Sequence, residues 1–356
     1  MKAAVLHGQR DVRFEEIPTP QPGPGEALIR VQMTGVCGSD VPRVLSDGAH
    51  FYPLVLGHET AGEVVATGRD TDAAWVGRRA AVAPLLPCHQ CVQCQAGNYA
   101  QCPHYSFIGS RVNGGLAEYL VAPVANLTMV ADHVSFREAA FFEPSTVALH
   151  GLRQARYHEG EDVVVLGAGT IGLFTAQWAR ILGARRVAVV DINPARLAMA
   201  SAIGADAVFN SQDPGFRAAI RDWQDGRGFG FSFETAGQNA TMSLAFELAA
   251  VHSQVCFIGN SHADLHFDSA TFELMNRREF QLTGSWMSYS APFPGEEWSL
   301  TAECIADGRL RILPEFVHDV FGLDQVMTAF QLFQTPGAVS GKILFSPATA
   351  ARSSHE

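Results

Sequence analysis

Hydrophobic and polar residues follow two different patterns along the chain, and the change comes near residue 160. Residues 1 to about 130 contain short β-branched runs, such as 28–31 and 62–66, between glycines and prolines. Short runs bounded by turn residues predict the strands of a β-rich domain. Near the end of this region, Ser135 and Glu138 have the spacing of a capping box, which predicts a helix running toward Phe142.

After residue 160, fully apolar runs alternate with segments of helical periodicity. Such runs predict buried parallel strands, and the segments between them predict helices that cross from one strand to the next. The strands are expected at 162–166, 186–191, 207–209, 229–234, 254–258 and 280–284, and the helices from the glycines near 170 to about 182 and at 194–203, 216–223 and 240–250. This order predicts a doubly wound parallel sheet.

The chain is therefore predicted to be an α/β protein with two domains. Residues 1–153 are expected to begin the β-rich domain, and residues 154–290 to form the doubly wound domain. Residues 291–356 are expected to return to the β-rich domain through a closing strand at 341–345, followed by a disordered tail from Thr349.

The bulk composition excludes several classes of protein. Hydrophobic residues make up 47% of the 356 residues, and charged residues 17%, which indicates a protein with a large core. The net charge of -11 argues against nucleic acid or an anionic membrane as the main partner. The first residues do not resemble a secretory signal, and no apolar run has the length of a membrane span. We expect a cytoplasmic protein with reduced thiols.

Four cysteines stand close together in the segment 84–104. Cys88, Cys91, Cys94 and Cys102 have the spacing C-x2-C-x2-C-x7-C. Four thiolates form the closed tetrahedral shell that is typical of a structural zinc ion. Two disulfides are the alternative, which a reducing compartment disfavours. The remaining Cys256 and Cys304 lie in apolar segments, and we expect them to be small buried residues.

Three glycines predict a dinucleotide site. Gly167, Gly169 and Gly172 stand between a predicted strand and a predicted helix, where they permit a tight turn, a close approach of a pyrophosphate and close helix packing. The helix N-terminus offers N–H groups to the phosphates. Asp191 ends the next strand, where a carboxylate accepts hydrogen bonds from ribose hydroxyls and repels a 2′-phosphate. The pattern favours NAD over NADP, although Arg196 lies close in sequence.

A second group of residues predicts an open zinc site. Taken alone, Cys37 would be interpreted as a buried thiol and His58 as a structural histidine. Beside a dinucleotide site and a separate cysteine quartet, they predict a catalytic zinc site with a carboxylate as the third ligand and a place left for water or substrate.

With these motifs in place, the chain resembles the zinc-dependent medium-chain dehydrogenase/reductase superfamily over residues 1–346. The segments 37–40, 57–59 and 167–172 and the cysteine quartet fall where that family has them. The segments 37–43, 47–53, 105–111 and 284–290 resemble its polyol dehydrogenase branch. The resemblance implies a GroES-like catalytic domain, an NAD-binding Rossmann domain, one catalytic and one structural zinc ion per chain, and a homodimer or homotetramer.

The resemblance also implies roles for single residues. Cys37 and His58 would bind the catalytic zinc, with either Glu59 or Glu143 as the third ligand. Asp40 would orient His58. Ser39 would take the alcohol proton. The implied cofactor-binding residues are Gly167, Gly169, Thr170, Ile171, Gly172, Asp191, Arg196, Thr235, Ala236, Ile258, Gly259, Ser285 and Trp286.

The implied activity is hydride transfer between a secondary alcohol of a polyol or polyol phosphate and NAD, which gives a ketose. Galactitol 1-phosphate or a free hexitol is the expected substrate, and sorbitol, xylitol, idonate and threonine are alternatives. A phosphate would need cations, for which Arg43 and Arg111 are candidates. A zinc-free NADPH-dependent enone reductase and a non-enzymatic relative are the competing hypotheses.

The chain departs from the family in one respect. Many relatives carry a histidine two or three residues after the position of Asp40, and that histidine passes the proton to solvent. Pro42 and Arg43 occupy those positions here. The proton would therefore leave through water, through the nicotinamide ribose or through another group such as His50.

Overall fold

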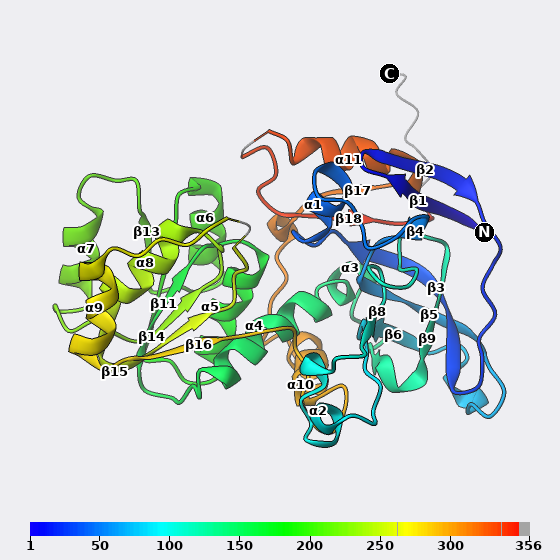
Figure 1. Ribbon diagram of the computed structural model, residues 1–356, viewed down its shortest axis with the longest axis horizontal. Helices are drawn as coiled ribbons and strands as arrows, with labels where there is room; N and C mark the ends of the chain where they lie inside the picture. Colours follow the sequence, from blue (N-terminus) through cyan, green and yellow to red (C-terminus); the bar gives the residue numbers. More distant parts are fainter. Residues whose placement is uncertain (262, 336, 349–356) are drawn as a thin grey trace. The chain divides into compact units, whose positions relative to one another are not determined.

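The computed structural model describes residues 1–261, 263–335 and 337–348, which form two compact units (Figure 1). Unit 1 contains residues 1–143, 289–308 and the described residues from 312 onward, and unit 2 contains residues 144–288 and 309–311.

The first division falls inside the helix α4 (Phe142–Gln154), between Glu143 and Pro144. The sequence placed this boundary at 153, because it predicted the helix that leads to Phe142 but not the one that begins there. The tail expected to be disordered, from Thr349, lies outside the described residues.

Unit 1 is built on sheets whose strands come from both ends of the chain. Its strands are β1 (Lys2–Gly8), β2 (Asp11–Glu16), β3 (Glu26–Gly35), β4 (Leu54–Val55), β5 (Glu59–Thr67), β6 (Arg79–Val82), β7 (Leu85–Leu86), β8 (Ser106–Phe107), β9 (Tyr119–Pro123), β10 (Leu127–Met129), β17 (Val317–Phe321) and β18 (Lys342–Phe345). Within the described residues, the largest sheet has the order β10-β6-β5-β3-β18-β17, and β9 also pairs with β3. The other sheets are β2-β1-β4 and β7-β8. A strand near the end of the chain thus lies beside one near its start.

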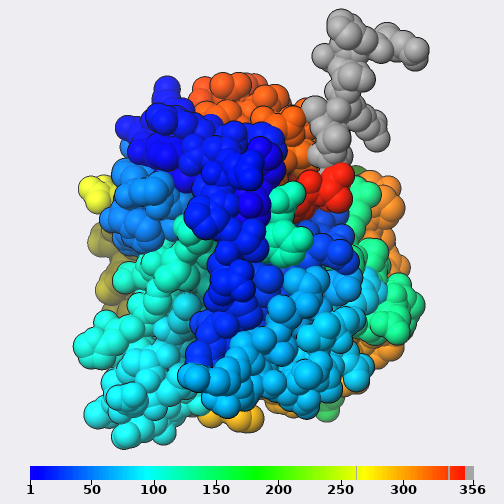
Figure 2. Space-filling model, turned by 90° about the vertical axis from the view of Figure 1, so that its right-hand side faces the viewer, coloured from blue at the N-terminus to red at the C-terminus, as the bar shows by residue number. Residues whose placement is uncertain are grey.

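Short helices complete unit 1. They are α1 (Asp40–Leu45), α2 (Val92–Gln95), α3 (Phe136–Ala139), α10 (Glu296–Ala306) and α11 (Val326–Leu332). Ser135 and Glu138 form the predicted capping box at the start of α3. Figure 2 shows the N-terminal strands, in dark blue, beside the C-terminal helix α11, in orange. Leu6 and Leu54 pack with Phe330 and Phe345 in one core cluster of this unit, so that residues from both chain ends share a core.

Unit 2 is a parallel sheet covered by helices. Its strands are β11 (Asp162–Leu166), β12 (Arg186–Asp191), β13 (Ala207–Asn210), β14 (Phe229–Glu234), β15 (Ala249–Phe257) and β16 (Gln281–Gly284). They lie in the order β13-β12-β11-β14-β15-β16, with every pairing in the described part of this sheet parallel. The helices are α5 (Thr170–Ile181), α6 (Pro194–Ala202), α7 (Phe216–Trp223), α8 (Asn239–Leu248) and α9 (Ser269–Arg278). The strand order reverses between β11 and β14, which is where doubly wound sheets bind dinucleotides.

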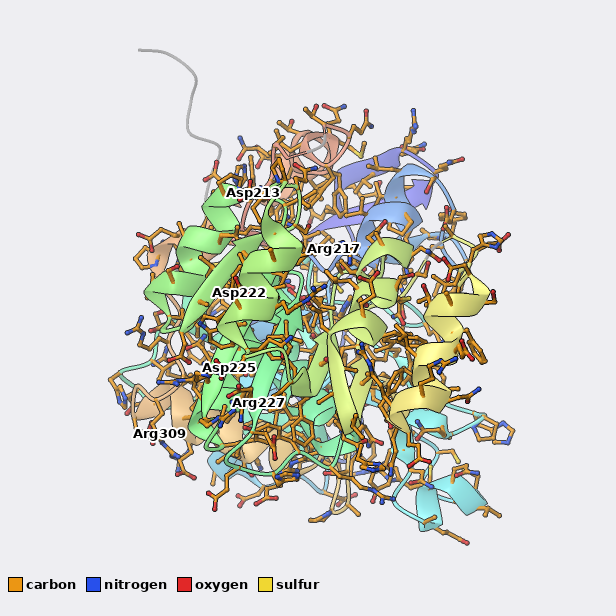
Figure 3. The ribbon with its side chains drawn as sticks, turned by 90° about the vertical axis from the view of Figure 1, so that its left-hand side faces the viewer. Asp213, Arg217, Asp222, Asp225, Arg227 and Arg309 are labelled. Carbon is orange, nitrogen blue, oxygen red and sulfur yellow. The ribbon has the colours of Figure 1, made fainter. Side chains whose placement is uncertain are left out.

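Helix α7 shows how the apolar pattern sets the packing of unit 2. Phe216 and Ile220 lie one turn apart and are buried in the core of this unit. Arg217 and Asp222 are exposed on the same helix, and Asp225 follows in the next turn (Figure 3). This amphipathic spacing is why the helix was predicted at its observed bounds.

The predicted fold class, a β-rich domain with a doubly wound parallel-sheet domain, is confirmed. Two neighbouring elements were wrong in extent: the helix expected at 240–250 ends at Leu248, because the strand expected at 254–258 already begins at Ala249 and ends at Phe257. Helix α9 was missed altogether. Leu274 and Met275 pack against the core of unit 2 but are only partly buried, so the apolar stripe on which a helix prediction depends is short.

Candidate active site

Cys37, His58 and Glu59 come together in unit 1 at the ends of two neighbouring strands. Cys37 follows β3, and His58 and Glu59 stand at the start of β5, which pairs with β3 in the register Gly35 to Glu59. One ligand atom from each of the three side chains lies within 4.8 Å of the other two. His58 is 5% exposed and Glu59 is 1% exposed. A sulfur, an imidazole nitrogen and a carboxylate oxygen grouped in this way fit a zinc ion.

Asp40 connects the parts of this cluster. Its Oδ2 accepts a hydrogen bond from the backbone N–H of Cys37 at 3.3 Å and lies 3.6 Å from Nδ1 of His58. Its Oδ1 accepts a hydrogen bond from Nη1 of Arg43 at 2.9 Å, and the same nitrogen donates to Oγ of Ser39 at 3.1 Å. Burial alone would lower the pKa of His58, but the charges of Asp40 and Cys37 raise it to about 10. The cluster therefore stabilises positive charge, as a metal site must.

Glu143 stands in the first turn of α4 and takes part in the electrostatics of the same cluster. Burial raises its pKa to about 7, the charge of His58 opposes this rise, and the charge of Glu59 adds to it. A cation bound nearby would favour its ionised form. The group with mutually close ligand atoms contains Glu59, and Glu143 lies within electrostatic range of it.

Lys342 is a member of the site that the sequence analysis missed. Its Nζ donates to both carboxylate oxygens of Glu59, at 2.6 and 2.5 Å, and to the carbonyl oxygen of Val36 at 3.1 Å. Lys342 was read only as part of the closing strand at 341–345. A lysine within an otherwise apolar strand was the one available signal, because a buried lysine needs a buried partner.

His50 and the two candidate phosphate-binding arginines belong to one electrostatic group in unit 1. Burial lowers the pKa of His50 below 6.5, and the charges of Arg111 and Arg43 lower it further. Arg111 donates to Oη of Tyr105 at 3.3 Å, and its guanidinium lies 4.4 Å from the centre of the Tyr105 ring. His50 is therefore mostly neutral at pH 7 and able to accept a proton.

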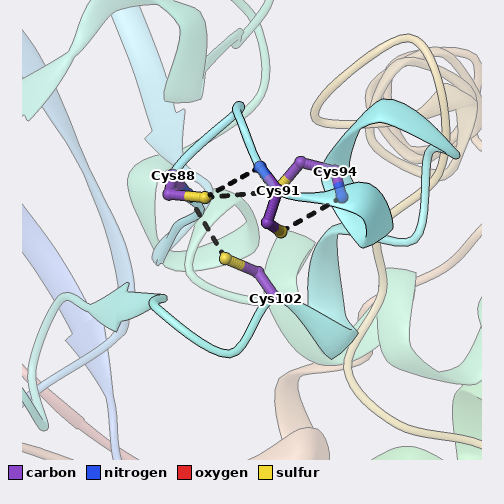
Figure 4. Close-up of side chains that lie close together, drawn as sticks. All are labelled: Cys88, Cys91, Cys94 and Cys102. Atoms are coloured by element: carbon purple, nitrogen blue, oxygen red, sulfur yellow. Dashed lines mark hydrogen bonds between the residues drawn. The ribbon is translucent and has the colours of Figure 1, made fainter.

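The predicted cysteine quartet is assembled in space (Figure 4). The four sulfur atoms of Cys88, Cys91, Cys94 and Cys102 lie within 4.8 Å of one another. Backbone N–H groups point at the sulfurs: Cys91 donates to Cys88 at 3.4 Å, and Cys94 donates to Cys91 at 3.5 Å. Hydrogen bonds from the backbone of Gln90 and Cys91 lower the pKa of Cys88 to about 6, which favours the thiolate that zinc binds. These residues fit a closed, structural metal site.

The quartet loop packs on the segment by which the chain re-enters unit 1. Phe293 contacts the rings of His89 and Tyr99, with ring centres 5.3 and 5.2 Å apart. Tyr289 stacks on Phe293 and accepts a hydrogen bond from the backbone N–H of Leu85 at 2.9 Å. The loop thereby fixes the returning chain.

The glycine loop of unit 2 has the geometry that its motif predicts. Gly167 has a φ of +99°, and a Cβ at Gly172 would lie 1.8 Å from the carbonyl oxygen of Gly167. The carboxylate of Asp191 accepts hydrogen bonds from the backbone N–H of Ala168 at 2.6 Å and of Asn193 at 2.8 Å. Each carboxylate oxygen has a second lone pair, so Asp191 can accept from a ribose hydroxyl as well.

Glu234, at the end of β14, is a second residue that the sequence analysis missed. Its Oε1 accepts hydrogen bonds from the backbone N–H groups of Ala236 and Gly237, each at 2.9 Å, and from Oγ1 of Thr241 at 2.6 Å. A Cβ at Gly259 would lie 2.7 Å from its Oε2. This buried carboxylate holds the loop after β14, which contains Ala236, and lies against Gly259 in the loop after β15; both residues are expected to bind the cofactor. An acidic residue at the carboxyl end of a parallel strand, as with Asp191, was the available signal.

The other expected cofactor residues lie in the same unit. Thr235 donates to the carbonyl oxygens of Leu166 and Gly167, which ties it to the glycine loop. Ser285 follows β16 with a buried hydroxyl, Trp286 is 46% exposed and Ile258 is 7% exposed. Thr170 and Ile171 begin α5, and Arg196 stands in the first turn of α6.

The outlying cysteines behave as expected. Cys256 and Cys304 are fully buried, and burial raises the pKa of Cys256 to about 12.

Among the helices that the structure describes, none combines the length and the apolar character needed to cross a bilayer.

Comparison with known proteins identifies the family. The alcohol dehydrogenase GroES-like domain matches residues 23–132, and the zinc-binding dehydrogenase domain matches residues 170–305. The chain is 39% identical over 322 residues to galactitol 1-phosphate 5-dehydrogenase of Escherichia coli K12, covering 89% of this chain and 92% of that protein. It is 32% identical to sorbitol dehydrogenase of Bacillus subtilis 168, covering 73% of this chain and 75% of that protein.

The fold agrees with these similarities. The crystal structure of galactitol-1-phosphate dehydrogenase from Escherichia coli matches with a TM-score of 0.90 and 37% identity, covering 98% of this chain and 100% of that chain. The chain belongs to the zinc-binding medium-chain dehydrogenase/reductase superfamily, among the oxidoreductases of its polyol dehydrogenase branch.

Proposed function

We propose that this protein is a zinc- and NAD-dependent polyol dehydrogenase that converts a secondary alcohol to a ketone. Galactitol 1-phosphate is the leading substrate, followed by a free hexitol such as galactitol. The observation that carries the proposal is the grouping of Cys37, His58 and Glu59 within 4.8 Å in a chain of this family. The names of the two relatives, one acting on galactitol 1-phosphate and one on sorbitol, support the substrate class.

The residues around the cluster can each take a part in proton transfer. Zinc held by Cys37 and His58, with Glu59 or Glu143, would supply a Lewis acid that makes an alcohol oxygen more acidic. Ser39 can take the alcohol proton, and the hydrogen bond from Arg43 at 3.1 Å stabilises negative charge on its oxygen. Arg43 stays protonated and cannot carry the proton onward. A neutral His50 can, by way of water.

Unit 2 would supply the cofactor site. The turn at Gly167 and the start of α5 would receive the pyrophosphate of NAD. Asp191 would accept the ribose hydroxyls, and the loop held by Glu234 would line the cofactor. The quartet would hold the second zinc ion. The expectations of a cytoplasmic location and of a homodimer or homotetramer stay predictions.

An activity screen with metal analysis tests the proposal. The purified protein is assayed with galactitol, sorbitol, xylitol, idonate, threonine and the hexitol 1-phosphates, with NAD and NADP side by side. We expect two zinc ions per chain and NAD-linked oxidation of a hexitol or its phosphate. Reduction of enones with NADPH by a protein with no zinc at Cys37 would overturn it in favour of the zinc-free reductase. Inactivity of the zinc-loaded protein on the whole panel would favour a non-enzymatic relative.

A further inference from the structure

Unit 2 contains a cavity of about 410 Å³ at the end of its sheet opposite to the glycine loop. All of its lining residues belong to unit 2, and one of them, Arg227, is labelled in Figure 3. Glu161 and Arg185 line the cavity directly before β11 and β12. Gly167 directly follows β11 and Asp191 ends β12, so about 16 Å of strand separates the cavity from the glycine loop. The cavity is therefore distinct from the proposed cofactor site.

The cavity is left open by the backbone at the start of β14. Gly228 and Gly230 line it there without side chains, and a Cβ at Gly230 would collide with Oε2 of Glu161. The pairing of β14 with β15 changes register at the same place, so that residues 250–253 stand outside the paired register and line the cavity as well. Missing side chains and the displaced strand together make the hollow.

Two opposite charges line this cavity without partners. Arg185 is already paired with Asp162 through two hydrogen bonds of 2.8 and 2.7 Å. Arg156 is exposed and Glu161 is partly buried, and among the residues that the structure describes neither side chain forms an ion pair or a hydrogen bond. The cavity thus offers a guanidinium with its N–H donors unused and a carboxylate with its lone pairs unused.

Neutral polar groups converge on the same space. The ring of His158 stands edge-on to Phe231, with ring centres 5.1 Å apart, and its Nδ1–H donates to the carbonyl oxygen of Glu159 at 3.3 Å. Its Nε2 can then accept a hydrogen bond. The hydroxyl of Ser253 donates to the carbonyl oxygen of Ala250 at 2.8 Å and can also accept one. A cavity with a few convergent polar groups is the usual form of a small-molecule site.

The charges favour one class of ligand. Among the described residues that line the cavity, three are arginines and two are carboxylates, which favours an anion over a zwitterion. A guanidinium binds a phosphate group through a fork of two N–H donors. A carboxylate repels a bare anion but accepts hydrogen bonds from hydroxyl groups.

We propose that this cavity binds a small hydroxylated phosphate ester, such as a sugar phosphate, with its phosphate on Arg156 and its hydroxyls on Glu161. The inference does not rest on the proposed function, because the cavity shares no residue with the proposed active site.

Calorimetric titration of the whole protein with glucose 6-phosphate, inorganic phosphate and glucose is the first test. The Kd for glucose 6-phosphate should be at least about tenfold lower than the Kd for either fragment, because only the ester engages both charges. Arg156→Gln should raise it by about tenfold or more. The control, Arg221→Gln, changes an exposed arginine of α7 outside the cavity and should leave the Kd within about twofold.

The carboxylate gives a test in which two ligands respond in opposite directions. Glu161→Ala removes the acceptor for hydroxyls together with the charge that repels phosphate. The Kd for glucose 6-phosphate should rise by about fivefold or more, whereas the Kd for inorganic phosphate should fall. Tighter binding of both ligands would show that Glu161 only repels anions, and the proposed ligand class would be wrong.

The remaining outcomes separate this site from the active site. Cys37→Ser should bind glucose 6-phosphate within about twofold of the wild-type Kd, and loss of binding in that variant would place the ligand at the active site instead. An unchanged Kd in Arg156→Gln, or a wild-type protein with no binding below about 10 mM, would also overturn the inference. None of these results bears on the proposed dehydrogenase activity, which the substrate panel tests separately.

Discussion

Arg43 contacts two side chains that lie beside the candidate zinc ligands. Its Nη1 donates to both Ser39 and Asp40. A guanidinium group remains charged at every working pH, so it stabilises an oxyanion but cannot pass a proton. Under the proposed function the alcohol proton therefore needs another exit, and we propose His50, whose pKa is lowered by burial and by the charges of Arg111 and Arg43.

Asp191 gives a prediction about cofactor choice. Its carboxylate orders the glycine loop through the backbone of Ala168 and Asn193, and under the proposed function it also binds the ribose. We expect Asp191→Asn to raise the Kd for NAD by about tenfold or more, because an amide nitrogen cannot accept these hydrogen bonds. The Kd for NADP should rise less, since the substitution also removes the repulsion between the carboxylate and the 2′-phosphate of NADP. Fluorescence titration with both cofactors measures the ratio.

The exposed Asp213→Asn variant is the control, because that residue stands on the surface of the same unit (Figure 3). An unchanged ratio of NAD to NADP affinity in Asp191→Asn would contradict the assigned role of the carboxylate.

The sequence predicted those site residues whose spacing is local. The quartet and the glycine loop have their signal within one short segment, and the structure assembles both. Lys342 and Glu234 gave no such local signal, because the role of a buried charge becomes clear only when its partner is known. The partner of Lys342 is 283 residues away, and the partners of Glu234 are mostly backbone N–H groups, which carry no sequence pattern.

At the scale of elements, the starts of two parallel strands are joined by charge. Asp162 begins β11, and its carboxylate accepts hydrogen bonds from Arg185 at 2.8 and 2.7 Å and from Arg186 at 3.3 and 2.5 Å. Burial alone would raise the pKa of Asp162, but the two arginines outweigh it, and the pKa lies below 3.8. The ionised carboxylate is therefore favoured in the folded state.

Replacing this carboxylate should destabilise the protein in a way that depends on pH. Because the folded pKa is depressed, the stabilisation is present above about pH 4 and is lost as the pH falls through the folded pKa. Asp162→Asn should lower the free energy of unfolding by about 1–2 kcal/mol at neutral pH, since both arginines are partly exposed and water weakens the pair. The difference from the wild-type protein should shrink below about pH 4.

Urea unfolding of both proteins across this pH range measures the effect. The control is Asp225→Asn, which removes an exposed carboxylate 2.9 Å from Arg227 and 4.0 Å from Arg186, and should change the stability by less than about 0.5 kcal/mol. A difference between Asp162→Asn and the wild type that stayed constant with pH would show that the charge of Asp162 is not the cause.

Elements were predicted well where burial is complete. All five residues of β11 are buried, and its apolar run was predicted at its observed bounds. Helix α9 and the two-residue strands of unit 1 were not predicted, because they have either a short, partly buried apolar face or too few residues to show a period.

At the scale of the whole molecule, the two cysteine sites should differ in what their loss does. We expect Cys37→Ser to abolish turnover while the melting temperature stays within about 2 °C of wild type, because an open site contributes little to folding. Cys91→Ser should lower the melting temperature by about 5 °C or more, because the quartet loop fixes the returning chain through Phe293.

Thermal unfolding and zinc content of both variants measure this division, and each variant should retain one zinc ion of the two. Equal losses of melting temperature would contradict it.

The two-part architecture was predictable from the change of pattern near residue 160, but the makeup of unit 1 was only partly so. The sequence placed a closing strand at 341–345, yet it could not show that this strand pairs with β3. Pairing between distant strands depends on the register of both, and one sequence shows only one strand at a time.

The pairing of Glu59 with Lys342 also has a consequence for biosynthesis. At about 5–20 residues per second, a ribosome needs about 15–60 s to pass from one residue to the other, and it completes residues 144–288 within that interval. Unit 2 should therefore fold while unit 1 still lacks β17 and β18, so that the domain begun first is finished last. Ribosome-bound chains that end before β17 should resist proteolysis in unit 2 and be cut in unit 1. Until Lys342 is synthesised, the nascent chain carries the Glu59 carboxylate without its cationic partner.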